Sequence, residues 1–347
     1  MKSPPIAIPI FSAMLALASP ASAQSDPAPG ASARTLYRSA DIDATPRELF
    51  TSFTTGEGLI RVWLAGQADF DLSIGGRMRV RYTKDGSLDD PATIVNTVLA
   101  YEPDRMIAIK PSAPDNAPPF LKKICQTGWN IVRFEPLSDG TRTRLSVTGL
   151  GYGEGPDYDQ AYTFFGTHNQ EVLDHVKALY SKSSAAASAP VMTSPTDHQP
   201  KPTAIDSTAF VAFGHIPVDL HKHALVNAAP DAVFAAWTTS AGLKSFLGVE
   251  SNIDLRIGGP MEIYFGSTQP LGQRGSEGCQ ILSYVPDKML SFSWNAPPKF
   301  PDERGKRTWI VISLSPVEAG KTRVDLQHLG FGPSEQGHWG EVRTYFD

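Results

Sequence analysis

The sequence contains two copies of one domain-sized pattern, and this repeat restricts the fold more than any other feature. Shifting the 347-residue chain on itself by about 184 residues superimposes matching positions along most of its length. A period of about 20 to 50 residues would indicate a solenoid, whereas this longer spacing indicates two whole domains. The clearest matches are Pro46 with Pro230, Phe50 with Phe234, Gly58-Leu59 with Gly242-Leu243, Gly75-Gly76 with Gly258-Gly259, Trp129 with Trp309, and Leu150-Gly151 with Leu329-Gly330.

The segments outside the two copies predict an exported protein with a linker. Residues 1–23 have the pattern of a cleaved secretory signal, with Lys2, an apolar stretch, and Ala21-Ser22-Ala23 before Gln24. A single-span anchor is the alternative, but the apolar stretch is too short to cross a bilayer. We therefore expect a periplasmic or secreted protein. Its expected parts are the signal 1–23, a flexible lead-in 24–35, a first domain 36–181, a Ser/Ala/Pro linker 182–218 and a second domain 219–347.

Composition favours packed globular domains and narrows the range of partners. The chain has 41% hydrophobic residues, enough for a core in each domain. Its 36 acidic and 31 basic residues give a net charge of -5 without a long Lys/Arg run, so nucleic acid is not an expected partner. No stretch is long enough for a transmembrane span. Cys125 and Cys279 occupy non-equivalent positions in the repeat, so we expect buried or half-buried thiols rather than an interdomain disulfide.

Each copy is predicted to begin with a strand and a short helix. In the first copy Thr45, Pro46 and Glu48 form a capping box, which starts a helix, and a second short helix is expected at 59–64. The apolar period then changes to two, which predicts strands with one inward face. The expected strands are 36–43, 77–82, 92–101, 105–110, 129–136 and 142–148, and in the second copy 222–227, 260–265, 289–294, 309–314 and 322–328.

A long helix is expected to close the first copy. From Tyr158 to Ser181 apolar residues recur at steps of three and four, and the stripe includes Phe165 and His168. About 24 helical residues span roughly 36 Å, long enough to cross a sheet. The predicted class is therefore α+β, with two tandem domains that each wrap a curved antiparallel sheet around a long C-terminal helix, the second having that helix cut short.

This order, with the hairpin at Gly75-Gly76 and the strand entry Tyr101-Glu102-Pro103-Asp104-Arg105-Met106, resembles the START-like helix-grip (SRPBCC) superfamily. Within it, the sequence is most similar to domains resembling the activator of the Hsp90 ATPase. The resemblance covers nearly all of both copies. It implies an apolar cavity between sheet and helix, which in many members holds a lipid, sterol, polyketide or other hydrophobic small molecule. The motifs concern the fold rather than catalysis.

The second copy departs from the pattern at its end. Tyr345-Phe346 aligns with Phe164-Phe165, near the start of the long helix, and the later helical turns have no counterpart. Uncovering that apolar face would cost several kcal/mol or more, at about 25 cal/mol per Å2. Either the sequence is a fragment or frameshifted product, which is the interpretation we favour, or another segment covers the groove.

Large aromatic residues are the candidate lining of the implied cavity. They could equally be ordinary core, since aromatic residues dominate both settings. The candidates are Trp63, Tyr82, Trp129, Phe134, Phe165 and His168 in the first copy, and Phe246, Phe265, Trp294 and Trp309 in the second.

No residue set identifies a reaction. His168 could orient a ligand or act as an acid/base group, although a core histidine with one hydrogen bond is the simpler interpretation. His221 and His223 share one strand face, but they lack further identifiable metal ligands. Arg77, Arg79 and Arg81 form a basic row that is typical of a solvated sheet face. Nucleophile elbows, phosphate loops and dinucleotide fingerprints are absent, so we assign no catalytic residue, metal or cofactor.

Three hypotheses of function follow. The first is non-covalent binding of an apolar small molecule or lipid, and the second is a cyclase, dehydratase or hydrolase that uses the same cavity with His168. The third is a protein-interaction module, as the Hsp90-activator resemblance implies, although an exported protein would not meet a cytosolic chaperone. The sequence leaves ligand identity and oligomeric state open.

Overall fold

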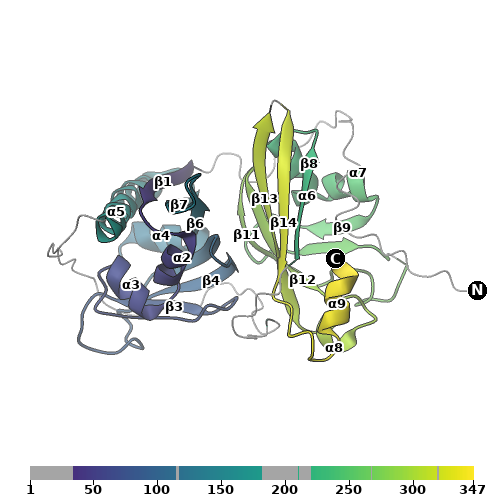
Figure 1. Ribbon diagram of the computed structural model, residues 1–347, viewed down its shortest axis with the longest axis horizontal. Coiled ribbons are helices and arrows are strands. Elements are labelled where there is room, and N and C mark those ends of the chain that lie inside the picture. Colours follow the sequence, from purple (N-terminus) through teal and green to yellow (C-terminus); the bar gives the residue numbers. More distant parts are fainter. Residues whose placement is uncertain (1–33, 115–116, 182–209, 211–219, 267, 319) are drawn as a thin grey trace, which may run out of the picture. The chain divides into compact units, whose positions relative to one another are not determined.

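A computed structural model describes residues 34–114, 117–181, 210, 220–266, 268–318 and 320–347. The chain divides into two compact units, and we call the described residues within 34–181 the first unit and residue 210 with those within 220–347 the second unit. The expected signal segment and nearly all of the expected linker lie outside the described residues. Each unit combines antiparallel strands with helices (Figure 1), so the predicted α+β tandem helix-grip fold is confirmed.

The first unit has one seven-stranded antiparallel sheet in the order β1-β7-β6-β5-β4-β3-β2. The long helix α5 packs against β1, β7 and the short helix α4 (Figure 1). The elements are β1 (Arg34–Ile42), α2 (Pro46–Phe53), α3 (Gly56–Val62), β2 (Gln67–Phe70), β3 (Arg77–Arg81), β4 (Ile94–Glu102), β5 (Met106–Ser112), α4 (Pro119–Thr127), β6 (Trp129–Pro136), β7 (Thr143–Tyr152) and α5 (Pro156–Tyr180).

The second unit follows the same element order with a divided sheet. Five strands pair in the order β11-β12-β13-β14-β8, and β9 and β10 form a separate pair. The elements are β8 (Leu220–Val226), α6 (Pro230–Thr238), α7 (Ser240–Leu247), β9 (Glu250–Ile253), β10 (Met261–Tyr264), β11 (Ile281–Val285), β12 (Met289–Asn295), α8 (Pro301–Arg304), β13 (Arg307–Glu318), β14 (Lys321–Leu329) and α9 (Trp339–Phe346).

The local signals behind these elements act as the sequence predicts. Thr45 caps α2 by accepting from the Glu48 amide, while the Glu48 carboxylate accepts from the Thr45 amide at 2.8 Å. Gly75 and Gly258 hold equivalent turns with φ of 79° and 75°, a region that costs glycine little. The amide of each donates to a strand carbonyl 2.8 Å away. The two hairpins therefore have the same backbone conformation and the same hydrogen bond.

Two hydrogen bonds from buried threonine side chains repeat as well. The Thr143 hydroxyl at the start of β7 donates to the Ala44 carbonyl at 2.7 Å. The Thr322 hydroxyl in β14 donates to the Ala228 carbonyl at the same distance. Each bond fixes a strand to the loop that precedes the first helix of its unit. Equivalent positions of the repeat thus make equivalent contacts.

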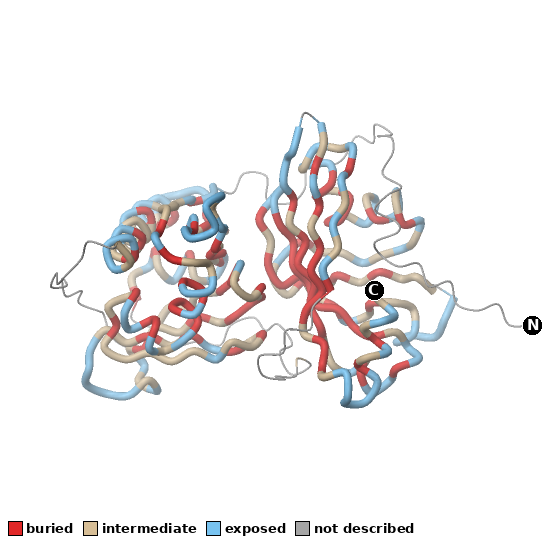
Figure 2. The backbone as a smooth tube through the Cα atoms, in the orientation of Figure 1, coloured by how far each residue is buried: buried red, intermediate tan, exposed pale blue. Residues whose placement is uncertain are grey.

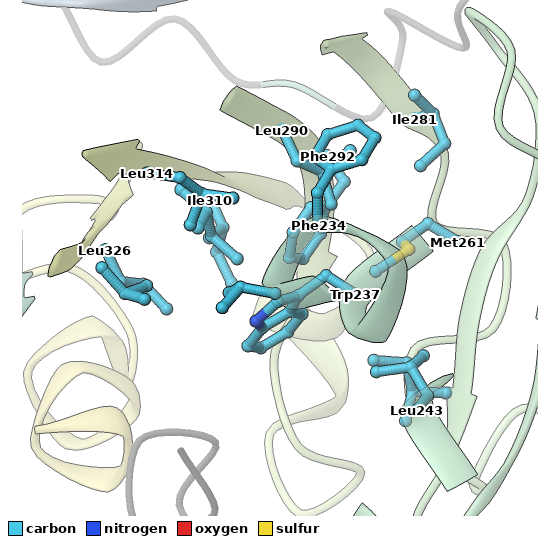
Figure 3. Packing of buried hydrophobic residues seen from close by; sticks show 14 of the residues in the cluster. Phe234, Trp237, Leu243, Met261, Ile281, Leu290, Phe292, Ile310, Leu314 and Leu326 are labelled. Carbon is cyan, nitrogen blue, oxygen red and sulfur yellow. The ribbon is translucent and has the colours of Figure 1, made fainter. Parts of the chain in front are cut away.

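Each unit has its own core between sheet and helices. The main core of the first unit includes Phe50, Phe53 and Phe134, with Leu173 and Val176 from α5. Along α5, buried residues alternate with exposed ones (Figure 2), as an amphipathic helix on a sheet requires. In the second unit Phe234 and Trp237 of α6 point into the core against residues of the sheet (Figure 3).

The structure differs from the sequence prediction at element boundaries, such as α3, which spans Gly56–Val62 and not 59–64, and in short helices. Strand β1 begins at Arg34, inside the expected lead-in, because it pairs along its length with β7. Helix α4 was not predicted, although Pro119 at its first turn and the i, i+4 pair Phe120 and Ile124 are helix signals. Helix α9 has eight residues, at the place where the closing helix of the second copy was expected to start. In the described part of the chain no helix combines the length and the apolar character of a membrane span.

Candidate functional site

The N-terminal half of α5 packs with α4 in a cluster that we call the aromatic seam. Its rings meet edge to face, with centroids 5.5 Å apart for Phe120 and Phe164 and 5.3 Å apart for Tyr152 and Tyr162. The seam comprises the buried residues Leu36, Phe120, Ile124, Tyr152, Tyr158 and Ala161 and the partly buried residues Leu121, Tyr162, Phe164 and Phe165.

A small hollow lies at the edge of this seam. It is lined by residues of α5, α4 and the ends of β5, β6 and β7, and its volume is about 10 Å3. That volume is about the minimum for one water molecule, so the seam is closed in this structure. Burial raises the pKa of Tyr152, which keeps the phenol at the hollow neutral. The lining residues are Pro111, Ile124, Gly128, Trp129, Asn130, Leu150, Tyr152 and Phe165.

Two predicted lining residues, Trp129 and Phe165, therefore meet at the same hollow. His168, one helical turn after Phe164, stacks on that ring with centroids 4.0 Å apart. One of its ring nitrogens, Nδ1, lies 2.8 Å from the Phe164 carbonyl oxygen. His168 is thus half-buried and tied to its own helix, which is the arrangement of a core histidine with one hydrogen bond.

The other first-unit candidates lie outside the seam. Phe134 is 1% exposed and packs edge to face on Phe50 and Phe53, each with centroids 5.6 Å away. Trp63 follows α3 at the rim of the main core, and its indole nitrogen is buried with no hydrogen-bond partner. Tyr82 follows β3 and is half-buried, and its burial raises the pKa of the phenol. Their role as ligand contacts stays a prediction.

In the second unit three of the four candidates share one core. Trp294 is a buried member, and Phe246 and Phe265 pack against it half-buried. The Phe265 and Trp294 rings meet with centroids 6.4 Å apart. Because Ile310 and Ile312 belong to that core, strand alternation places Trp309 on the opposite face of β13. Phe246, Phe265 and Trp294 therefore belong to one core and Trp309 lies outside it, and the role of these four residues as ligand contacts stays a prediction.

Two of the three arginines in the predicted basic row pair with neighbouring acids. Arg79 pairs with Asp69 and Asp89, and Arg81 pairs with Asp90 at 3.0 Å. Arg77, Arg79 and both Asp89 and Asp90 line an open hollow of about 240 Å3 in the first unit. The charges there nearly balance, so the hollow lacks the excess of one sign that would attract an ion.

The histidine pair of the second unit is exposed. His221 lies 3.4 Å from Asp325, and its ring centroid is 6.4 Å from that of His223. Within the described ranges, no three His, Cys, Asp or Glu residues are placed to hold a metal ion. Cys125 is half-buried and Cys279 is buried, and both are free thiols.

Two polar side chains near the seam are not among the residues that the sequence predicts for a site. Arg38 lies on the face of β1 toward α5, and Asn169 lies on the face of α5 toward the sheet. Neither has a sequence signal, because a single arginine in a strand or asparagine in a helix is more often solvated. Their place becomes clear only when the register of β1 and the packing of α5 are known.

One family of known proteins matches both units of the chain. The family described as "Activator of Hsp90 ATPase homolog 1-like protein" matches residues 43–180 and 227–343, one segment in each unit. A search of curated proteins finds no match.

Solved structures are similar at low sequence identity. A protein from Mesorhizobium loti is 18% identical, covers 44% of this chain and 100% of its own, and has a TM-score of 0.34. An Hsp90 activator from Plasmodium falciparum is 19% identical over 40% of this chain and 94% of its own, with a TM-score of 0.29. The di-domain ARO/CYC protein BexL is 9% identical over 90% of this chain and 99% of its own, with a TM-score of 0.32. Since the family matches both units and most of the chain, this protein belongs to the activator of Hsp90 ATPase homolog 1-like family and carries two of its domains in tandem.

Proposed function

We propose that the first unit binds an apolar small molecule between α5 and the sheet. The observation that carries the proposal is the aromatic seam, in which Tyr162, Phe164 and Phe165 remain only partly buried. Partly buried aromatic side chains that share one seam can move apart and close on a flat or elongated apolar ligand. The fold of the family supports small-molecule binding as well as a cyclase-type reaction. We favour binding because His168, the acid/base candidate, is tied to its own helix.

Binding at the seam requires movement, because the hollow of about 10 Å3 cannot hold a ligand. The exposed side chains of α5 and α4 form the outer wall of the seam, and a shift of these helices separates Phe164 and Phe165 from Phe120. The apolar area that a ligand covers would offset the contacts that this opening breaks. Uptake should therefore be slower than diffusion allows, since it waits for the seam to open.

A fluorescence titration tests this function. The apolar probe N-phenyl-1-naphthylamine is expected to bind the full chain saturably, and Phe165→Glu should weaken binding at least about tenfold because it puts a carboxylate in an apolar site. Thr167→Glu is the matched control, since Thr167 is exposed on the same helix two residues later. Far-UV circular dichroism checks that both variants fold. A wild-type chain that takes up no probe, or an equal loss in both variants, would contradict the proposal.

We also propose that the chain is exported, because residues 1–23 have the pattern of a cleaved signal. N-terminal sequencing of protein from the native host tests this directly. A mature chain that starts at Gln24 supports export, and a chain that starts at Met1 contradicts it. Export would also separate the protein from cytosolic chaperones.

A further inference from the structure

The inner surface of the first unit carries one arginine between its two apolar clusters. Strand alternation puts Leu36, Arg38 and Ala40 on the same face of β1. Leu36 belongs to the aromatic seam, and Ala40 packs against the main core. Arg38 is half-buried between them, and its Nε donates to the Gly166 carbonyl of α5 at 3.2 Å. A guanidinium therefore lies at the junction of β1 with the middle of α5.

Arg38 has no acidic partner among the residues that the structure describes. Besides the bond to Gly166, its Nη1 donates to the Tyr37 carbonyl at 2.9 Å. Nη2 makes no hydrogen bond with a described residue, although it would lie 3.0 Å from a Cβ at Gly166. Arginines in partly buried positions usually pair with a carboxylate, because the guanidinium offers donors in a planar fork and loses solvation on burial. The positive charge of Arg38 is thus left without a counter-charge at this point.

Asn169 places a buried donor that lacks a partner one helical turn from Gly166. Gly166 and Asn169 are separated by three residues and are neighbours on the surface of α5. The Asn169 side-chain Nδ2 is buried and has no hydrogen-bond partner. A buried donor that lacks a partner costs free energy, and such groups in native proteins call for an explanation. A carboxylate between β1 and α5, with one oxygen toward each side chain, would satisfy both Asn169 and Arg38.

We infer that the ligand of the first unit is an apolar molecule with a carboxylate, whose charged end is held by Arg38 and Asn169 while its apolar part enters the aromatic seam. This inference rests on the proposed function, because it names the chemical class that the same site accepts. Arg38 supplies the charge and a directed donor, and Asn169 supplies a neutral donor to the other oxygen. Leu36, on the same face of β1, connects this polar end to the seam.

The test compares two probes that differ only at the head. Dodecanoate and 1-dodecanol each compete with N-phenyl-1-naphthylamine for the full chain at pH 8, where a carboxylate is ionised. We expect dodecanoate to bind the wild type at least about tenfold more tightly than dodecanol, the size of one or two charge-assisted hydrogen bonds. Raising the salt concentration should reduce this preference. This wild-type comparison needs no substitution and so does not depend on a variant that folds.

Arg38→Met keeps much of the side-chain length and removes the charge, so the preference should fall below about threefold while dodecanol binding changes little. Asn169→Leu, in which leucine has a volume similar to that of asparagine, should weaken dodecanoate binding a few fold. Arg47→Met removes a charge from the exposed Arg47–Asp104 pair and should keep the full preference. Equal affinity of the two probes for the wild type, or a full preference in Arg38→Met, would overturn the inference while leaving the proposed function intact. If neither probe binds, the proposed function fails and this inference fails with it.

Discussion

The two units share a threonine hydrogen bond and a glycine turn, but helices of different length cover their sheets. Thr143 and Thr322 make the same 2.7 Å hydroxyl bond, and Gly75 and Gly258 hold the same turn. In the first unit the sheet is covered by the 25 residues of α5, whereas α9 in the second unit has eight. The repeat position of Phe53 is Trp237 in the second unit, where a larger ring occupies the core (Figure 3). Backbone geometry is thus kept between the copies, while the side chains that fill volume differ.

The largest expected effect concerns the ring that distinguishes the second core. Trp237 is 1% exposed and lies against Phe246 and Phe292, so Trp237→Ala should lower the free energy of unfolding by about 3 to 5 kcal/mol. Chemical denaturation followed by circular dichroism measures the loss. Leu271→Ala is the control in the same unit, because Leu271 is 80% exposed and should change stability by less than about 0.5 kcal/mol. Similar effects of the two substitutions would contradict the assigned core.

Two leucine substitutions in α5 test whether this helix covers the sheet of the first unit. Leu173 of α5 is fully buried in the main core, so Leu173→Ala should cost about 2 to 5 kcal/mol. Leu179, on the same helix, is partly exposed, and Leu179→Ala should cost under about 1 kcal/mol. The two changes remove the same atoms, so the difference in denaturation midpoint reports packing alone. Equal midpoints would mean that α5 does not cover the sheet as described.

The stability of the second unit should depend on pH in a way that the first unit lacks. His328 occupies the repeat position at which the first unit has Gly149. His328 is buried, its Nε2 lies 2.7 Å from the Thr308 hydroxyl, and burial lowers its pKa to about 3. The unfolded chain binds a proton near the ordinary pKa of about 6.5 and the folded chain does not. Stability should therefore fall as pH drops from about 6.5 toward 3, by roughly 2 kcal/mol between pH 6.5 and 5.

Denaturation of His328→Gln at several pH values checks this expectation. The variant should lose much of the decline between pH 6.5 and 5, since a glutamine takes up no proton. His223→Gln, at an exposed position of β8, should retain the wild-type profile. An unchanged decline in His328→Gln would assign the acid sensitivity to other groups.

The smallest change in stability is expected from removing the threonine hydrogen bond that the two units share. Thr143→Val and Thr322→Val each remove a buried hydroxyl donor from a carbonyl oxygen, that of buried Ala44 and that of half-buried Ala228. Each should lower the free energy of unfolding by about 1 to 2 kcal/mol, because the carbonyl loses a hydrogen bond that water replaces incompletely at these positions. Thr35→Val, at an exposed position of β1, is the control. A large effect in one unit without any in the other would break the equivalence of the copies.

Much of the fold could be predicted because its signals are local. The capping box at Thr45 acts over a few residues, the glycine turn at Gly75 recurs at Gly258, and the apolar stripe of α5 extends over many turns. Helix α4 was missed because its apolar pair is short and follows a Pro-rich segment. Such a short helix is stabilised by its contact with α5 rather than by its own sequence.

The candidate site could be predicted only in part. Phe165 and Trp129 were expected to line a cavity and do border the hollow, but the volume of a hollow depends on how rings from distant segments pack. Phe134 has the same aromatic character and is solid core. Arg38 could not be found, because its position between two clusters depends on the pairing of β1 with β7. Periodicity assigns a residue to a face, whereas burial and partners depend on tertiary contacts.

Hydrogen exchange of the full chain with and without dodecanoate tests most directly whether the first unit binds an apolar ligand beneath α5. Amides of residues 161–172 should exchange more slowly with the ligand present, because the ligand holds the seam and the middle of α5 together. Amides of α9 in the second unit should exchange at the same rate in both samples. Unchanged exchange in α5 at saturating dodecanoate, or protection confined to the second unit, would contradict the account.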